Sequence, residues 1–259
     1  MTWDWFNWLA PLAVLGWLAA GWAAIRRKEA RAEILMAAGL AVFTVFIIGL
    51  WVKLERPPMR TMGETRLWYS FFLAGAGWLA FRRWKYSWLL AFSAVMASLF
   101  AAINVFKPEI HSQALMPALQ SCYFIPHVAA YMLSYSILAV AAIASLVQLR
   151  KRGRGQADPR LYAFLDNVVY IGLGFLMLGL VSGAAWAKEA WGHYWSWDPK
   201  ETWAFVTAAA YLLYIHLRLR DARPALTLLT LTLGFILLMF TWLGVSFLPA
   251  AAGSVHVYS

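Results

Sequence analysis

The sequence predicts an all-α fold, a polytopic bundle of about eight transmembrane helices. Of its 259 residues, 63% are hydrophobic and only 13% are charged, which leaves too little polar surface for a soluble domain of this length. Apolar segments long enough to cross a bilayer recur along the whole chain. Basic residues gather in alternate connections between these segments, as in membrane proteins. The net charge of +10 is therefore interpreted as an orientation signal and predicts no nucleic-acid binding.

The predicted spans cover about residues 5–25, 32–52, 67–81, 87–106, 125–148, 161–187, 202–217 and 225–247. The third and seventh are short for a full crossing. We divide the chain into a four-span region, residues 1–110, and a second region, residues 111–259. The basic, glycine-containing segment "RKRGRGQAD" at residues 150–158 is a second candidate boundary between two halves. The N-terminus "MTWDWFNW" lacks a basic region and a cleavage site, so we expect the first span to be retained.

The basic residues predict the orientation of the chain in the membrane. Fifteen lie in connections on one side: Arg26, Arg27, Lys28, Arg31, Arg82, Arg83, Lys85, Arg150, Lys151, Arg152, Arg154, Arg160, Arg218, Arg220 and Arg223. Seven lie on the other: Lys53, Arg56, Arg60, Arg66, Lys107, Lys188 and Lys200. Because the richer side faces the cytoplasm, both termini and the aromatic segment at residues 186–203 are expected on the extracytoplasmic side.

That aromatic segment, "WAKEAWGHYWSWDPKETW", has a part that folding alone explains. Trp186 and Trp203 fall near the ends of predicted spans and are interpreted as interfacial anchors. Asp198, Pro199 and Glu201 fit the N-cap, N1 and N3 positions of a helix, so the cap is a sufficient structural role for Asp198.

Four other rings of the segment need a different explanation: Trp191, Tyr194, Trp195 and Trp197. Interfacial anchoring needs one or two rings at a helix end, whereas these four crowd one connection. Such a cluster forms a flat apolar platform with polar edges. It suits a large planar ligand.

All five histidines lie at or beyond residue 111, and the first four spans contain none. His127 and His256 both map to the outer side, where they would supply axial ligands on the two sides of a haem iron above the aromatic platform. The alternatives are an interfacial hydrogen bond for His127 and a disordered tail for His256. His193 is interpreted as an exposed loop residue, and His111 receives no role.

His216 is the one histidine predicted at depth on the inner side. It follows Trp203 by 13 residues, roughly 20 Å along a helix, or about two-thirds of a hydrocarbon core of about 30 Å. An ionisable group at that depth suggests function. The alternative is an interfacial histidine that snorkels beside Arg218. A bis-histidine site here would need a second ligand from another residue type, a second copy or a partner chain.

The motif "WGHYWSWDPKE" at residues 191–201 resembles the tryptophan-rich WWD motif of the CcsA/ResC family, which handles haem in System II cytochrome c biogenesis. Three more stretches resemble that family: "PALQSCYFIPHVAAYMLSYSIL", "GLGFLMLGLVSGAAWA" and "WLGVSFLPAAAGSVHVYS". The resemblance covers residues 115–259 well, and the first hundred residues resemble the family only as apolar spans. His193 occupies a variable position of the motif, and Cys122 in "LQSCYF" is unusual and is interpreted as incidental.

The resemblance implies roles for matching positions. His127 and His256 would ligate the iron of haem b at the outer face, and His216 would belong to an inner haem site. Trp191, Tyr194, Trp195, Trp197 and Asp198 would form the outer haem platform. The chain would be a multi-pass protein of the bacterial cytoplasmic (inner) membrane.

The resemblance also implies partners and an activity. With a CcsB/ResB membrane protein, the chain would move haem outward and present it for thioether attachment to the CxxCH motif of an apocytochrome c. No general base or nucleophile is evident in the sequence, so its expected share in a holocytochrome c synthase is positioning. Candidate cations for the haem propionates are Lys188, Lys200, Arg56, Arg60 and Arg66. The alternatives are a CcmC-like haem carrier without ligase activity and a b-type electron-transfer cytochrome, which would need paired histidines within the spans.

Overall fold

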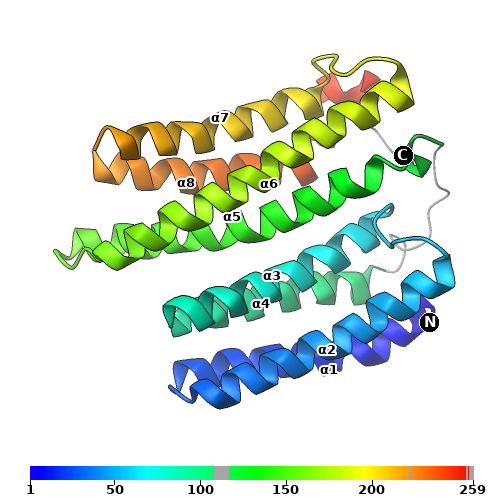
Figure 1. Ribbon diagram of the computed structural model, residues 1–259. Coiled ribbons are helices and arrows are strands. Elements are labelled where there is room, and N and C mark those ends of the chain that lie inside the picture. The colour runs from blue at the N-terminus through cyan, green and yellow to red at the C-terminus, as the bar shows by residue number, and fades with distance from the viewer. Residues whose placement is uncertain (108–116, 222, 255, 257–259) are drawn as a thin grey trace. The chain divides into compact units, whose positions relative to one another are not determined.

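The computed structural model describes residues 1–107, 117–221, 223–254 and 256. In this part of the chain all regular secondary structure is helical, which confirms the predicted fold class (Figure 1). The α-helices are α1 (Trp3–Ile25), α2 (Glu29–Leu54), α3 (Met62–Trp84), α4 (Ser87–Phe106), α5 (Phe124–Gly153), α6 (Pro159–Trp191), α7 (Pro199–Leu219) and α8 (Pro224–Met239). His111 lies outside the described residues.

Several of these helices are long and apolar enough to cross a bilayer, so this is a multi-pass membrane protein. Among the described residues, α1, α2, α4, α5, α6 and the segment Pro224–Phe247 meet both criteria. Helices α3 and α7 are longer than the short third and seventh spans predicted from the sequence. Helix α3 has 23 residues and α7 has 21, which correspond to about 35 and 32 Å. Both helices continue beyond their apolar stretches into capped, polar ends.

The chain divides into two compact units, Met1–Leu115 (unit 1) and Met116–Ser259 (unit 2). In unit 1, α1 packs against α2 and α4, and α3 packs against α2 and α4. In unit 2, α5 packs against α6 and α8, and α7 packs against α6 and α8. The basic segment at residues 150–158 lies at the α5–α6 turn inside unit 2. The prediction that this segment separates two halves is therefore wrong. Its basic residues and glycines form the turn between two helices of the same unit.

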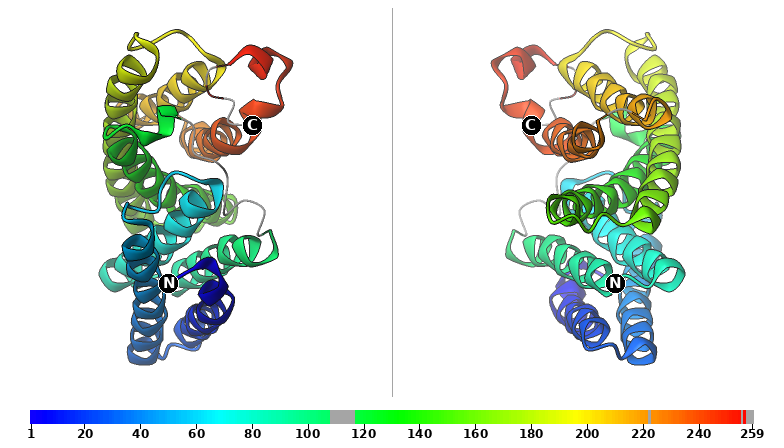
Figure 2. Two further views of the ribbon diagram at one scale, coloured as in Figure 1. Left: turned by 90° about the vertical axis from the view of Figure 1, so that its right-hand side faces the viewer. Right: turned by 90° about the vertical axis from the view of Figure 1, so that its left-hand side faces the viewer.

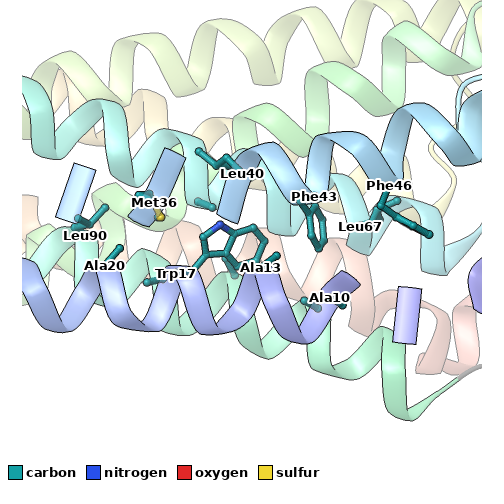
Figure 3. Packing of buried hydrophobic residues seen from close by; sticks show 14 of the residues in the cluster. Ala10, Ala13, Trp17, Ala20, Met36, Leu40, Phe43, Phe46, Leu67 and Leu90 are labelled. Carbon is teal, nitrogen blue, oxygen red and sulfur yellow. The ribbon is translucent and has the colours of Figure 1, made fainter. Parts of the chain in front are cut away.

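Unit 1 has an apolar core built on α1 and α2. Figure 3 shows the Trp17 indole directed from α1 toward Leu40 and Phe43 of α2. Trp17 is fully buried, and its ring centroid lies 4.9 Å from that of Phe43. A Cβ at Gly39 would lie 2.7 Å from the indole, so the ring occupies space that only glycine leaves. The described part of unit 1 contains no histidine.

The α2–α3 connection of unit 1 is organised by a buried carboxylate, Glu64. It caps α3 through a capping box with Thr61. Arg56 donates to both of its carboxylate oxygens at 2.9 and 2.8 Å, and the backbone N–H of Arg60 donates at 2.6 Å. The guanidinium fork of Arg56 is thus held by Glu64 in bidentate geometry.

In unit 2, the start of α5, the α6–α7 connection and the C-terminal segment share one end of the helical bundle. After α8 the chain makes a π-helical turn, Phe240–Gly244, and two short 3₁₀ segments, Val245–Phe247 and Pro249–Gly253. Figures 1 and 2 both show this red segment curling beside the yellow α6–α7 connection. Trp203 packs on Phe240 at 4.7 Å between ring centroids. The departure from a straight helix brings His256 back over the bundle end.

Candidate functional site

His127 lies in the first turn of α5, next to Pro126, as the sequence predicts. Its Nδ1 lies 2.8 Å from the carbonyl oxygen of Gly179 on α6. Because a carbonyl only accepts, Nδ1 carries the hydrogen and Nε2 keeps a free lone pair. The ring stacks on Trp186 at 5.5 Å and meets the edge of Tyr131 at 4.6 Å.

Glycines on α6 create the space in which the His127 ring lies. A Cβ at Gly183 would lie 2.6 Å from His127 Nδ1, and a Cβ at Gly179 would lie 2.2 Å from the Tyr131 ring. The two glycines are four residues apart and therefore share one face of α6, the arrangement that lets membrane helices approach closely. The histidine is thus fixed by backbone proximity as well as by hydrogen bonding.

His256 reaches the same end of unit 2 from the C-terminal segment. Its Nδ1 lies 2.9 Å from Oδ1 of Asp198, and its side chain is 11% exposed. Its backbone N–H donates to Ser254 Oγ, and its carbonyl accepts from Lys200 Nζ at 3.3 Å. Burial lowers the pKa of His256 below its ordinary value, although the nearby Asp198 carboxylate opposes the shift. The ring is therefore neutral at pH 7, and Nδ1 carries the hydrogen that faces the Asp198 carboxylate.

Trp186 contacts both histidines. It is 1% exposed, and its Nε1–H donates to the carbonyl of Ala118 at 2.7 Å. Its ring centroid lies 5.5 Å from that of His127 and 5.7 Å from that of His256. The prediction that Trp186 is only an interfacial anchor is wrong, because α6 continues to Trp191 and carries this indole into a buried position.

Asp198 combines a structural role with a contact to the site. As predicted, it caps α7: its carboxylate accepts from the N–H of Lys200 at 3.0 Å, and Glu201 completes the capping box. Burial alone would raise the pKa of Asp198, but hydrogen bonds from Ser254, from the Lys200 N–H and from His256 hold it below the ordinary value. An ionised carboxylate therefore faces the His256 ring.

The rings of the α6–α7 connection separate into two groups. Trp191 is half-buried and packs on Trp186 at 4.7 Å and on His256 at 4.6 Å. Trp195 and Trp197 pack edge-on at 5.7 Å, and Trp197 also contacts Phe205 at 6.0 Å. Trp197 is 65% exposed and Tyr194 is 61% exposed. The structure brings only Trp191 of this set against a histidine through a described ring contact.

Trp197 also has an unusual backbone. Its φ is +60°, a left-handed conformation that is uncommon for any residue except glycine, asparagine and aspartate. Such strain gathers at functional sites and persists where the surroundings impose it. His193, in the same loop, is exposed. Cys122, just before α5, is also exposed.

His216 lies in the last turn of α7, exposed and at the other end of the unit 2 bundle from His127 and His256. It follows Pro199 by 17 residues, about 25 Å along the helix. Tyr214 and Arg218 lie on another face, where both bond Asp166 of α6 at 2.6–2.8 Å. These contacts fix the C-terminal end of α7 and leave the face with His216 uncovered within the described part of unit 2.

The sequence contained signals for residues that its interpretation missed. Asp166 is a carboxylic acid within an apolar run, which suggests an intramembrane partner. Gly179 and Gly183 form a small-xxx-small pair, which predicts close helix contact. The role of Trp186 had no such signal, because a tryptophan near a helix end has the same pattern whether it anchors or packs.

Residues 5–251 match the family described as "Cytochrome C assembly protein". The chain belongs to this cytochrome c assembly protein family. It is similar to the cytochrome c biogenesis protein CcsA of one strain of Prochlorococcus marinus, with 30% identity over 258 residues, 83% of this chain and 81% of the relative. It is 35% identical over 170 residues to CcsA of Chlamydomonas reinhardtii, across 61% of this chain and 47% of that protein.

A third relative, CcsA of another Prochlorococcus marinus strain (MIT 9312), is 38% identical over 172 residues, which cover 53% of this chain and 55% of the relative. The chain therefore matches about half the length of two of these relatives and most of the length of another. These relatives identify this cytochrome c assembly protein as CcsA-like.

The site residues of this assembly protein fit haem better than a bare metal ion. Within the described residues no three His, Cys, Asp or Glu side chains gather to hold a metal. A haem iron needs only axial ligands, because the porphyrin supplies the other four nitrogens, and imidazole is a frequent axial ligand. His127 and His256 each offer Nε2 beside buried aromatic rings, which matches that requirement.

Proposed function

We propose that this chain is the CcsA-like subunit of a cytochrome c synthase. It binds haem b as cargo, moves it to the outer face and presents it for thioether attachment to the CxxCH motif of an apocytochrome c. One observation carries this proposal: His127 and His256, 129 residues apart in the sequence, both contact the same buried indole, and the Nδ1 atom of each is hydrogen-bonded.

The contribution of the chain is ligation and orientation. His127 and His256 offer Nε2 to the two sides of the iron. Trp186 and Trp191 give the histidines an apolar surrounding. Haem brings ferrous iron and two vinyl groups. Each thioether forms when a CxxCH thiol adds across a vinyl double bond: carbon–sulfur and carbon–hydrogen bonds form, and the S–H and vinyl π bonds break.

Lys200 is the best-placed cation for a haem propionate in this proposal. It lies beside His256, to whose carbonyl its Nζ donates. Lys188 is exposed nearby, with its ammonium 5.6 Å from the Tyr194 ring centroid. Arg56 is a poorer candidate because Glu64 already binds its guanidinium in bidentate geometry. Arg60 and Arg66 belong to unit 1, as does Arg56.

Tyr194, Trp195 and Trp197 remain in the proposed outer platform. The rings of Tyr194 and Trp197 are more than half exposed, so a planar ligand has apolar surface to cover. The left-handed backbone at Trp197 supports a role for this loop beyond connecting two helices.

His216 belongs to a proposed inner haem site that this chain completes with a partner. The described part of unit 2 contains His127, His193, His216 and His256, and the other three lie at the opposite end of α7. The exposure of His216 supports a second axial ligand from a CcsB/ResB-type membrane protein.

The proposed location is the cytoplasmic (inner) membrane of a bacterium, with the α6–α7 connection and both termini outside. In unit 2 the basic residues gather at the α5–α6 and α7–α8 turns, and the candidate outer site lies at the other end of the same helices (Figure 1). The positive-inside rule then places the aromatic connection on the extracytoplasmic face.

The test is co-expression with a CcsB/ResB partner and a reporter apocytochrome in cells that lack their own maturation system and any separate haem chaperone. We expect His127→Ala and His256→Ala to abolish covalent haem on the reporter. His193→Ala is the matched control, since it removes an exposed histidine from the α6–α7 connection at the same end of unit 2. Maturation by His127→Ala or His256→Ala at the wild-type level would reject the axial-ligand assignment. If wild type yields no covalent haem but purifies with haem, a carrier role replaces the synthase role.

A further inference from the structure

We propose that Asp198 is a positioning residue for the outer haem and acts through His256. Its contact makes His256 the retained axial ligand and leaves His127 as the ligand that the histidine of an incoming CxxCH motif displaces. The inference rests on the proposed function and assigns different roles to the two histidines.

The two imidazoles differ in the group that accepts their Nδ1–H. His256 donates to the carboxylate of Asp198 at 2.9 Å, whereas His127 donates to the neutral carbonyl of Gly179 at 2.8 Å. A hydrogen bond to an ionised acceptor is about twice as strong as one between neutral groups. A carboxylate partner also fixes the ring orientation and raises the basicity of the other ring nitrogen. Nε2 of His256 is therefore the stronger donor to iron.

Asp198 is held in place independently of the histidine. It is 8% exposed, it accepts from the N–H of Lys200 as the α7 cap, and it receives a hydrogen bond from Ser254. Glu201 in turn accepts from the backbone N–H of Asp198 at 3.2 Å. Because these contacts fix the carboxylate, His256 keeps its orientation whether or not iron is bound.

The exchange at His127 requires no redox partner. The bond between iron and Nε2 of His127 breaks, and a bond between iron and the substrate histidine forms. Both imidazoles are neutral, so no proton or electron has to be supplied. His127 keeps its hydrogen bond to Gly179 throughout, and its ring packs closely against Gly183 of α6.

Asp198→Asn tests the positioning role, because asparagine is as good an N-cap as aspartate and keeps an acceptor oxygen without the charge. Asp158→Asn is the matched control: Asp158 caps α6, is followed by Pro159 as Asp198 is by Pro199, and lies at the α5–α6 turn. We expect Asp198→Asn to lose outer haem about 10- to 100-fold faster and to raise its reduction potential. Asp158→Asn should match wild type. Equal haem loss and potential in Asp198→Asn and wild type would overturn the positioning role.

Carbon monoxide identifies the displaced histidine. The measurement uses reduced, haem-loaded protein that carries His216→Ala, so that the proposed inner site does not contribute. The Fe–C and C–O stretching frequencies then report the ligand opposite carbon monoxide at the outer site. We expect His127→Ala to leave these frequencies unchanged, and Asp198→Asn and His256→Ala to shift them. Shifts in His127→Ala, with His256→Ala unchanged, would reverse the assignment. If the protein with His127 and His256 intact shows no bis-histidine haem spectrum, the result rejects the proposed function itself, independently of the role of Asp198.

Discussion

Nδ1 of His127 lies where a side chain at Gly183 would begin: a Cβ built on Gly183 would be 2.6 Å from that nitrogen. The His127 ring can occupy this position only because residue 183 of the neighbouring helix α6 has no side chain. It also stacks on Trp186, three residues further along α6. The spacing between α5 and α6 therefore determines where one proposed iron ligand lies.

Gly183→Ala should displace His127 and weaken outer haem binding. The methyl group must push the ring away from Gly179, whose carbonyl accepts its hydrogen bond. Overpacking of this kind costs about 1–3 kcal/mol. Gly174→Ala is the control on the same helix, because its Cβ would meet nothing within 4 Å. Haem content after purification and the thermal midpoint in detergent measure the effect. Equal haem retention by both variants would show that the close approach does not position the ligand.

Trp186→Phe should weaken haem binding without unfolding the protein. Phenylalanine keeps an aromatic ring in contact with both histidines but removes the Nε1–H that donates to the Ala118 carbonyl. Loss of a buried hydrogen bond that leaves its partner unsatisfied costs about 1–3 kcal/mol. Trp22→Phe, at a tryptophan that is 64% exposed on α1, controls for tryptophan loss in general. The bis-histidine absorption spectrum and the melting curve are the measurements. A wild-type spectrum and melting curve for Trp186→Phe would contradict the idea that this indole organises the site.

Trp186, an interfacial anchor by its sequence position and a buried ring in the structure, separates what the sequence predicts from what it does not. Periodicity predicted the spans, and cap chemistry predicted the start of α7 at Pro199, because both depend on local neighbours. The meeting of His127, Trp186 and His256 depends on a close helix approach and on the turn after α8. These are tertiary features that have no local pattern. Motif resemblance named two histidines, but their shared indole is visible only in three dimensions.

Trp197→Gly separates the backbone of Trp197 from its ring. Glycine adopts a φ of +60° without steric cost, and the lost side chain is 65% exposed. We therefore expect the thermal midpoint to stay within a few degrees of wild type while reporter maturation falls, since the proposed platform loses a ring. Trp195→Gly, at a position without a positive φ, should lower the thermal midpoint more. Full maturation with Trp197→Gly would remove this ring from the platform.

Asp166→Asn should weaken the C-terminal end of α7 and, with it, the proposed inner haem site. Asp166 accepts from Tyr214 and from two nitrogens of Arg218, and its side chain is 24% exposed while that of Arg218 is 28% exposed. Hydrogen bonds to charged groups contribute about 1.5–3 kcal/mol, and partial exposure reduces that figure. Because Tyr214 and Arg218 flank His216, loosening them lets the last turn of α7 fray.

The measurement for Asp166→Asn is the haem content of the complex with the proposed CcsB/ResB partner, compared with the content at the proposed outer site alone. We expect the inner signal to decline and the His127–His256 signal to persist in haem-loaded protein, because the two sites are separated by most of α7. Asp221→Asn, an exposed acid just past the same helix, serves as the control. Equal loss of haem from both sites would mean that Asp166 supports the fold of unit 2 as a whole. Unchanged haem at both sites would show that the Asp166–Arg218 pair does not position His216.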